Sequence, residues 1–249
     1  MKTAIKILAI VIIVAAAMVF LRRESTAPVV SPSISSQYTT SSPQRTSTVA
    51  PTSRPTTVLF SDVPFTSQAP FGGWDDPRQQ DGCEEASALM AVRWARGQTL
   101  SSDEALKEIL AAADYEEATY GSYHDTNAQD TVTRIFKGYF KFDGATAKLD
   151  ITAKDIEAAL RKGMLVVVPA NGQLLGNPNY TAPGPDRHML VIIGYDPNKD
   201  EFITNDPGTR KGKGYRYKSS VLERAIFNYP TGDHVETAER RTAMITIQK

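Results

Sequence analysis

The residue best suited to chemistry is Cys83, the only cysteine in the 249-residue chain. It follows Asp81-Gly82, a turn sequence, and opens an apolar run that contains no Gly or Pro before Gly97. Because a helix that is apolar on most sides is a buried one, we expect Cys83 in the first turn of a central helix. Free backbone N–H groups and a partial positive charge stabilise a thiolate there, so we predict a thiol pKa below about 8.5.

Two considerations keep a second interpretation of Cys83 open. Glu84 and Glu85 follow it directly and oppose a thiolate electrostatically. A lone cysteine can also be a small, inert core residue. The alternative to a nucleophile is therefore a buried structural cysteine.

A thiolate nucleophile needs an imidazole partner, and the chain offers three histidines. His124 and His234 lie in polar loop sequences, YGSYHDTN and YPTGDHVE. His188 instead follows a long polar loop and begins the apolar strand HMLVIIGY. Active-site side chains collect at such strand mouths, so His188 is the candidate base; a satisfied core histidine is the alternative.

The candidate for orienting this histidine is Asp206. The stretch 188–206 predicts a hairpin, and with a turn centred on Asn198 the numbers of opposed residues add to 396. Asp206 then faces Leu190 and lies diagonal to His188 on the same face, about 7–8 Å away at the backbone. A one-residue slip would put the two side chains on opposite faces. The alternative for Asp206, which precedes Pro207-Gly208, is an ordinary turn aspartate.

A developing oxyanion needs hydrogen-bond donors, and Gln68 in VPFTSQAP is the candidate side chain, together with the Cys83 backbone N–H. Gln79 and Gln80 compete with Gln68 for this role. Metal binding by Cys83, His188 and Asp206 is a weaker interpretation, because no Cys-x-x-Cys or His-x-x-x-His spacing occurs. We expect no metal and no cofactor.

The elements that position these residues fall into two halves. Helices are expected first, over 83–96, 101–113, 126–140 and 152–162, the second opened by a Ser101–Glu104 capping box. Strands follow over 164–170, 188–196, 201–206, 213–218 and 241–248. This order predicts an α+β fold in which a helical half, with its buried central helix, packs on an antiparallel sheet.

The loop 171–187, which leads into His188, is rich in Gly, Pro and Asn and is predicted to contain no helix or central strand. Loops of this length in compact domains are usually functional, so we expect it to form one wall of a cleft. Leu174 and Leu175 are unusual in such a loop. They are expected to form a substrate-facing pocket or lid, or alternatively to pack on the sheet edge.

The chain outside this domain has a different composition. The apolar run Ile7–Leu21, between Lys6 and Arg22, predicts a membrane anchor over 1–23, with a signal peptide cleaved near Ala15-Ala16-Ala17 as the alternative. Residues 24–57 contain 9 Ser, 8 Thr and 5 Pro and predict a disordered stalk. Such stalks usually hold a domain outside a membrane, so we expect the domain, 58–249, to be extracytoplasmic.

Charge excludes one class of partner. Residues 59–249 carry 22 basic and 27 acidic side chains, a net charge of −5. A nucleic-acid-binding surface would need the opposite balance, so no nucleic-acid partner is expected.

Four short motifs, in order, resemble a known family: VPFTSQ, DGCEEASALMAV, HMLVIIGYD and NDP. They are similar to papain-like cysteine peptidases of the double-glycine, bacteriocin-leader-processing type and their secreted bacterial relatives, over about 60–230. The resemblance implies a papain-like fold with Cys83 as nucleophile, His188 as base, Asp206 as the residue that orients it and Gln68 as oxyanion donor. The family often has Gly-Pro where this chain has Glu84-Glu85. No transporter segment is present, so a double-glycine substrate is not implied.

These observations predict a membrane-tethered, extracytoplasmic cysteine peptidase that acts through a thioester on a peptide or protein substrate. Two alternatives stay open. A thiol-dependent transpeptidase or amidase on cell-wall peptides would pass through the same thioester, and a non-catalytic peptide-binding module would keep only the cleft.

Overall fold

The computed structural model describes residues 56–249. The predicted anchor, 1–23, and all but the last two residues of the predicted stalk, 24–57, lie outside the described residues. Within residues 56–249, no helix combines the length and the apolar character that a membrane span requires.

The first layer of the domain is helical and is built around α2, Cys83–Ala95, which begins at the cysteine as predicted. All residues of α2 except Arg93 and Ala95 are buried, which confirms a central buried helix. The capping box that was predicted at Ser101 and Glu104 opens α3. The layer also contains α1 (Pro77–Gln80), α3 (Ser102–Tyr120), α4 (Ala128–Asp130) and the π-helix η1 (Thr131–Tyr139).

The second layer is an antiparallel sheet with the strand order β2-β7-β3-β4-β5-β6, to which β1 adds by pairing with β4. The predicted strands are confirmed. Among the strands that follow α2, β2 was not predicted, because it is a short edge strand whose alternating residues include several polar ones. The strands are β1 (Val58–Leu59), β2 (Ala145–Leu149), β3 (Leu165–Ala170), β4 (His188–Asp196), β5 (Glu201–Asn205), β6 (Lys213–Lys218) and β7 (Ala243–Ile247).

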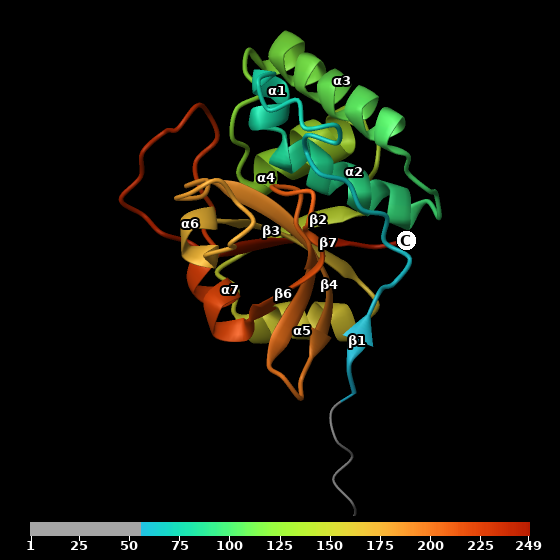
Figure 1. The fold of residues 1–249 in the computed structure, drawn as a ribbon, viewed down its shortest axis with the longest axis vertical. Helices are drawn as coiled ribbons and strands as arrows, with labels where there is room; N and C mark the ends of the chain where they lie inside the picture. The colour runs from blue at the N-terminus through green and yellow to red at the C-terminus, as the bar shows by residue number, and fades with distance from the viewer. Residues whose placement is uncertain (1–55) are drawn as a thin grey trace, which may run out of the picture. The chain divides into compact units, whose positions relative to one another are not determined.

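A third layer covers the other face of the sheet. Figure 1 shows α1–α3 on one side of the strands and α5 and α7 on the other. Strand β4 is buried on both faces: Met189 and Val191 belong to the core beneath α2, and Leu190 and Ile192 belong to the opposite core. This layer contains α5 (Ala153–Arg161), α6 (Gly172–Leu175) and α7 (Ser219–Ala225). The α+β class is confirmed, with helices on both faces of the sheet.

The short helix α6 contradicts the prediction that 171–187 contains no helix. The Asn171 side chain accepts a hydrogen bond from the Leu174 N–H, and Gly176 ends the helix in the left-handed conformation. Asn and Gly, which were interpreted as loop residues, therefore act as the two caps of a single helical turn.

The hairpin β4–β5 reaches the predicted register at the site by a different route. Near the turn the numbers of paired residues add to 397, as in Tyr195–Phe202 and Asp196–Glu201. A β-bulge between Ile192 and Gly194 then shifts the pairing, so that Val191–Asn205 has the predicted sum of 396. An extra residue in one strand changes which side chains share a face, so this bulge places His188 and Asp206 on the same one.

Candidate active site

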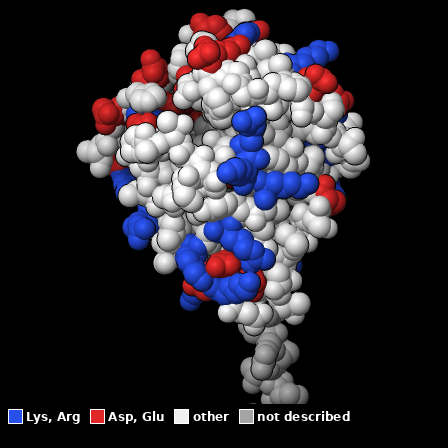
Figure 2. All heavy atoms as spheres, in the orientation of Figure 1, with Lys and Arg blue, Asp and Glu red and all other residues white. Residues whose placement is uncertain are grey.

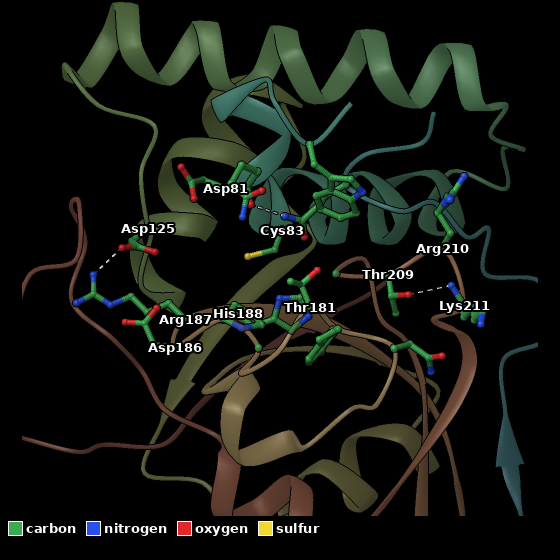
Figure 3. Close-up of a pocket in the computed structure, with 18 of the residues that line it drawn as sticks. Asp81, Cys83, Asp125, Thr181, Asp186, Arg187, His188, Thr209, Arg210 and Lys211 are labelled. Atoms are coloured by element: carbon green, nitrogen blue, oxygen red, sulfur yellow. Dashed lines mark hydrogen bonds and ion pairs between the residues drawn. The ribbon is translucent and has the colours of Figure 1, made fainter. Parts of the chain in front are cut away.

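The predicted site residues gather at one cavity of about 790 Å³, where the helical layer meets the sheet. Cys83, His188 and Gln68 line it. In Figure 3 the Cys83 sulfur and the His188 ring project into the space between α2 and the start of β4. Asp206 lies behind the histidine and is fully buried. The structure therefore brings together the four residues that the sequence singled out.

Local packing sets the position of Cys83. A Cβ atom on the preceding Gly82 would lie 2.6 Å from the Arg78 carbonyl oxygen, so only glycine allows the chain to approach α1 this closely. One turn after the cysteine, the Ser87 hydroxyl donates to the Met189 carbonyl oxygen at 3.1 Å. Because Met189 follows His188, this bond ties the head of α2 to the start of β4.

The thiol itself is buried, with 7% of Cys83 exposed, and its Sγ–H donates to Glu84 Oε2 at 2.8 Å. Burial raises the pKa of the Cys83 thiol well above its usual value, and the charges of Glu84 and Glu85 raise it further. The prediction of a lowered pKa is therefore wrong for this arrangement. Desolvation and two adjacent carboxyls outweigh the partial charge of the helix N-terminus.

The histidine and the aspartate form a direct pair, with 2.8 Å between His188 Nε2 and Asp206 Oδ1. His188 is 1% exposed and Asp206 is fully buried. Since Nε2 is engaged by the carboxylate, Nδ1 is the ring nitrogen left for the cavity and the thiol. This matches the register argument that placed both side chains on one face.

Three residues that sequence analysis missed complete this arrangement. The hydroxyls of Tyr180 and Tyr217 each donate to Asp206 Oδ2 at 2.6 Å, and the Asn177 amide donates to it at 3.4 Å. Pairing β6 with β5 would have suggested Tyr217. Tyr180 and Asn177 gave no periodic signal, because they lie in the irregular loop.

These contacts determine the charge of Asp206. Burial alone raises the pKa of this carboxyl, but the His188 charge, the His188 hydrogen bond and the two tyrosine hydroxyls reverse the shift and lower it. Gly208 N–H also donates to Oδ1 at 3.0 Å. The carboxylate is therefore held ionised behind the imidazole.

Gln68, the predicted oxyanion donor, lines the same cavity as Cys83. Its backbone N–H donates to the Pro207 carbonyl oxygen at 2.9 Å, which joins it to the loop after Asp206. Its side-chain Nε2 donates to the carbonyl oxygens of Gln79 at 3.1 Å and Gln80 at 2.7 Å. Both amide hydrogens are thus engaged, and donation to an oxyanion requires one of these bonds to exchange.

Three buried carboxyls, those of Glu84, Glu85 and Glu116, lie on the thiol side of the site, and Glu84 is the one that contacts Cys83. Glu84 Oε1 accepts hydrogen bonds from the Tyr229 hydroxyl at 2.7 Å and from the Thr126 N–H at 3.2 Å. Burial and the nearby Asp125 raise the pKa of Glu84 to about 7. The sequence showed that Glu84 follows Cys83, but neither its burial nor its tyrosine partner could be read from the motif.

The loop 171–187 forms a wall of the cavity, as predicted, through residues from Pro178 to Arg187. Its two leucines do not line the cavity. Leu175 is 4% exposed in the core that contains Ile226 and Leu222, and Leu174 packs against the same core. The pocket or lid interpretation is wrong, and the packing alternative is correct.

The two remaining histidines have different surroundings. His234 lies at the cavity, half exposed, with Nε2 3.4 Å from an Asp186 oxygen. His124 Nε2 lies 3.6 Å from an Asp81 oxygen. Neither contacts the His188–Asp206 pair, so the assignment of His188 as the candidate base stands.

Comparisons with known proteins agree with this geometry. A model of the peptidase C39-like family matches residues 60–231. A crystal structure named as a C39-like peptidase from Bacillus anthracis superposes with a TM-score of 0.51 and 17% identity, covering 78% of this chain and 99% of that one. At this identity the likeness shows the fold alone. No curated protein matches the chain. Because the family model spans well over half of the chain, this protein belongs to the peptidase C39-like family.

Proposed function

We propose that this protein is a cysteine peptidase that hydrolyses peptide bonds with Cys83 as nucleophile, His188 as base and Asp206 as the orienting carboxylate. One observation carries the proposal: a cysteine at the head of a buried helix and a His188–Asp206 pair of 2.8 Å meet at one cavity. Nucleophile, base and orienting group in this relation are the requirements of covalent acyl transfer.

The chemistry follows from the placement of the protons. As Sγ of Cys83 bonds to the substrate carbonyl carbon, the thiol proton passes to Nδ1 of His188, and Asp206 stabilises the resulting imidazolium. The oxyanion is met by backbone N–H groups of the first turn of α2, which have no acceptor within the helix, and by Gln68 if its amide exchanges a bond. The C–N bond then breaks, His188 protonates the leaving amine, and water hydrolyses the thioester.

The test uses the single cysteine. Wild-type protein incubated with a peptide library should release fragments, and a peptidyl electrophile should add one mass increment at Cys83. Cys83→Ala should abolish both while keeping the circular dichroism spectrum, and His188→Ala should abolish cleavage with Cys83 still present. Full cleavage by Cys83→Ala would rule out the mechanism. Products ligated to an added amine would identify transfer instead of hydrolysis.

We also propose that the domain acts outside the membrane, tethered through residues 1–23. The support is the apolar run and the Ser/Thr/Pro-rich stretch of the sequence. A flexible stalk of this length has an r.m.s. reach of roughly 30–35 Å. Protease added to intact cells should release a fragment that begins near residue 58. Complete protection of the domain would place it on the other side, and a fragment already free in the medium would indicate signal cleavage.

A further inference from the structure

The cavity has cationic side chains at one end. Arg210 and Lys211 line it and are both exposed, and among residues 56–249 neither has a carboxylate within ion-pair distance. In Figure 3 they lie to one side of Cys83 and His188. Figure 2 shows a group of Lys and Arg side chains in the middle of this face and a second group lower down that has Asp and Glu among it, with further Asp and Glu toward the upper margin.

The two cations are held in place by the loop that also carries Asp206. The Asp206 N–H donates to the Gly212 carbonyl oxygen at 3.1 Å, and the Gly212 N–H donates to the Thr209 carbonyl oxygen at 3.2 Å. A Cβ atom on Gly212 would lie 1.9 Å from the Asp206 carbonyl oxygen, so the loop closes tightly on itself. Arg210 and Lys211 therefore project from a short, internally bonded turn next to the catalytic pair.

The opposite end of the cavity carries the opposite charge. Asp81, Asp125 and Asp186 line it, and Figure 3 shows Asp125 and Asp186 on the side away from Arg210. Arg187 neutralises only Asp125, through a 2.5 Å ion pair. Within residues 56–249, the basic side chains closest to Asp81 and Asp186 are His124, at 3.6 Å, and His234, at 3.4 Å. Three aspartates against one arginine give this end of the cavity an excess of acidic side chains.

A substrate that spans the cavity thus meets a field that changes sign across the reacting thiol. We propose that the preferred substrates are peptides with an acidic group on the side of the scissile bond that lies over Arg210 and Lys211, and with no acid on the other side. This inference rests on the proposed peptidase function and names its substrate class. Trp74 also lines the cavity, and its loop approaches Arg210 at Gly72, which gives the stem of an acidic side chain an apolar surface to contact.

Binding can be measured apart from catalysis in the full-length Cys83→Ala chain. Matched fluorescent peptides would carry Glu, Gln or Lys at each of three positions on either side of the cleaved bond, with amidated C-termini. We expect Glu to bind better than Lys by at least about fivefold on one side only, and the difference to shrink with added salt. If a peptide with a free C-terminus and no Glu binds as well as the amidated Glu peptide, the group bound is a terminal carboxylate. Equal affinities throughout would overturn the proposal.

Reversing the charges of Arg210 and Lys211 tests whether these two residues cause the preference for Glu over Lys. The double variant Arg210→Glu with Lys211→Glu should invert the Glu-over-Lys preference, both in binding and in the kcat/KM of the active enzyme. Lys213→Glu changes another exposed lysine, at the start of β6 and outside the cavity, and is the matched control that should retain the preference. An unchanged preference in the double variant would disprove the subsite. Selective binding without cleavage by the wild type would instead show that the proposed peptidase function, and not this subsite, is wrong.

Discussion

Two buried carboxyls stand on either side of the candidate site, and they differ in their state of charge. Asp206, behind the imidazole, accepts hydrogen bonds from His188, Tyr180 and Tyr217, and its pKa is lowered. Glu84, beside the thiol, is almost as buried, but its neighbours include other acids, and its pKa is raised to about 7. Burial is common to both, so donors and a nearby cation decide which carboxyl stays ionised.

This difference in charge between Asp206 and Glu84 gives the imidazole side and the thiol side of the site different roles. On the imidazole side, a fixed negative charge orients the ring and stabilises it when it becomes charged. On the thiol side, burial of Cys83, together with the charge of Glu84 and the hydrogen bond to it, keeps the proton on sulfur at rest. In this arrangement the thiol is not ionised in advance, and its proton leaves as substrate is attacked.

The largest loss of peptide cleavage is expected from a substitution on the imidazole side of the site. Asp206→Asn removes the charge that stabilises the imidazolium, and it leaves three hydroxyl or amide donors facing a neutral amide. We expect kcat/KM for peptide cleavage to fall about 10²-fold or more, mostly in kcat. Asp143→Asn, at an exposed aspartate, is the control and should be unaffected. A loss smaller than about threefold would mean that Asp206 is only a turn residue.

The second prediction concerns the carboxyl pair behind the thiol. Glu85 and Glu116 are buried, and none of their carboxyl oxygens has a hydrogen-bond partner within residues 56–249. Burial and the charge of Glu84 raise the pKa of Glu116 from its usual 4.5 to about 8. At this carboxyl the folded state thus binds more protons than the unfolded state between these pH values, so the contribution of Glu116 to stability is greatest at low pH and is lost as the pH rises through that window.

Glu116→Gln should remove this loss and stabilise the protein at pH 8 relative to the wild type, on the order of 1–4 kcal/mol, with little gain at pH 4. Urea unfolding at several pH values measures the difference. Glu117→Gln, the exposed neighbour on α3, is the matched control. Parallel curves of stability against pH for Glu116→Gln and the wild type would show that Glu116 does not bind an additional proton in the folded state.

The third prediction isolates the charge next to the nucleophile. Glu84→Gln removes a carboxylate that raises the pKa of Cys83, so the thiolate forms at lower pH. Alkylation by iodoacetamide at pH 7 should become several-fold faster, with the midpoint of its pH profile shifted downward. Alkylation can be followed by mass spectrometry of the only cysteine. A profile that does not move would show that burial alone holds the proton on sulfur.

The sequence allowed prediction of those parts of the site that depend on local rules. Cys83 at a helix start and His188 at a strand start follow from periodicity and turn residues, and Asp206 follows from the hairpin. The turn of the hairpin is centred half a residue away from Asn198, where it was predicted. The bulge at Ile192–Gly194 shifts the register by one residue, and this shift restores the predicted pairing near the site. Without that bulge the predicted pair would lie on opposite faces.

The rest of the site depends on contacts between segments that are distant in sequence. Tyr229 reaches Glu84 across 145 positions and Tyr180 reaches Asp206 across 26, and no motif links either pair. The thiol pKa was mispredicted for the same reason. The helix N-terminus is visible in the sequence, whereas the depth at which it is buried depends on how the layers pack.

The smallest changes in reactivity are expected when a tyrosine next to each of the two carboxyls is replaced by phenylalanine. Tyr217→Phe removes one of two tyrosine donors to Asp206, while Tyr180 remains, so kcat/KM should fall about threefold to tenfold, as expected for the loss of one hydrogen bond to a charged group. Tyr229→Phe removes a donor that stabilises the Glu84 carboxylate. Glu84 then binds its proton more tightly, its charge beside sulfur decreases, and alkylation of Cys83 at pH 7 should be slightly faster. The two variants therefore have opposite signs, a slower reaction from the imidazole side and a more reactive thiol from the other. Equal losses of cleavage and of alkylation in both variants would show that the tyrosines serve only packing, and would remove the distinction between the two carboxyls.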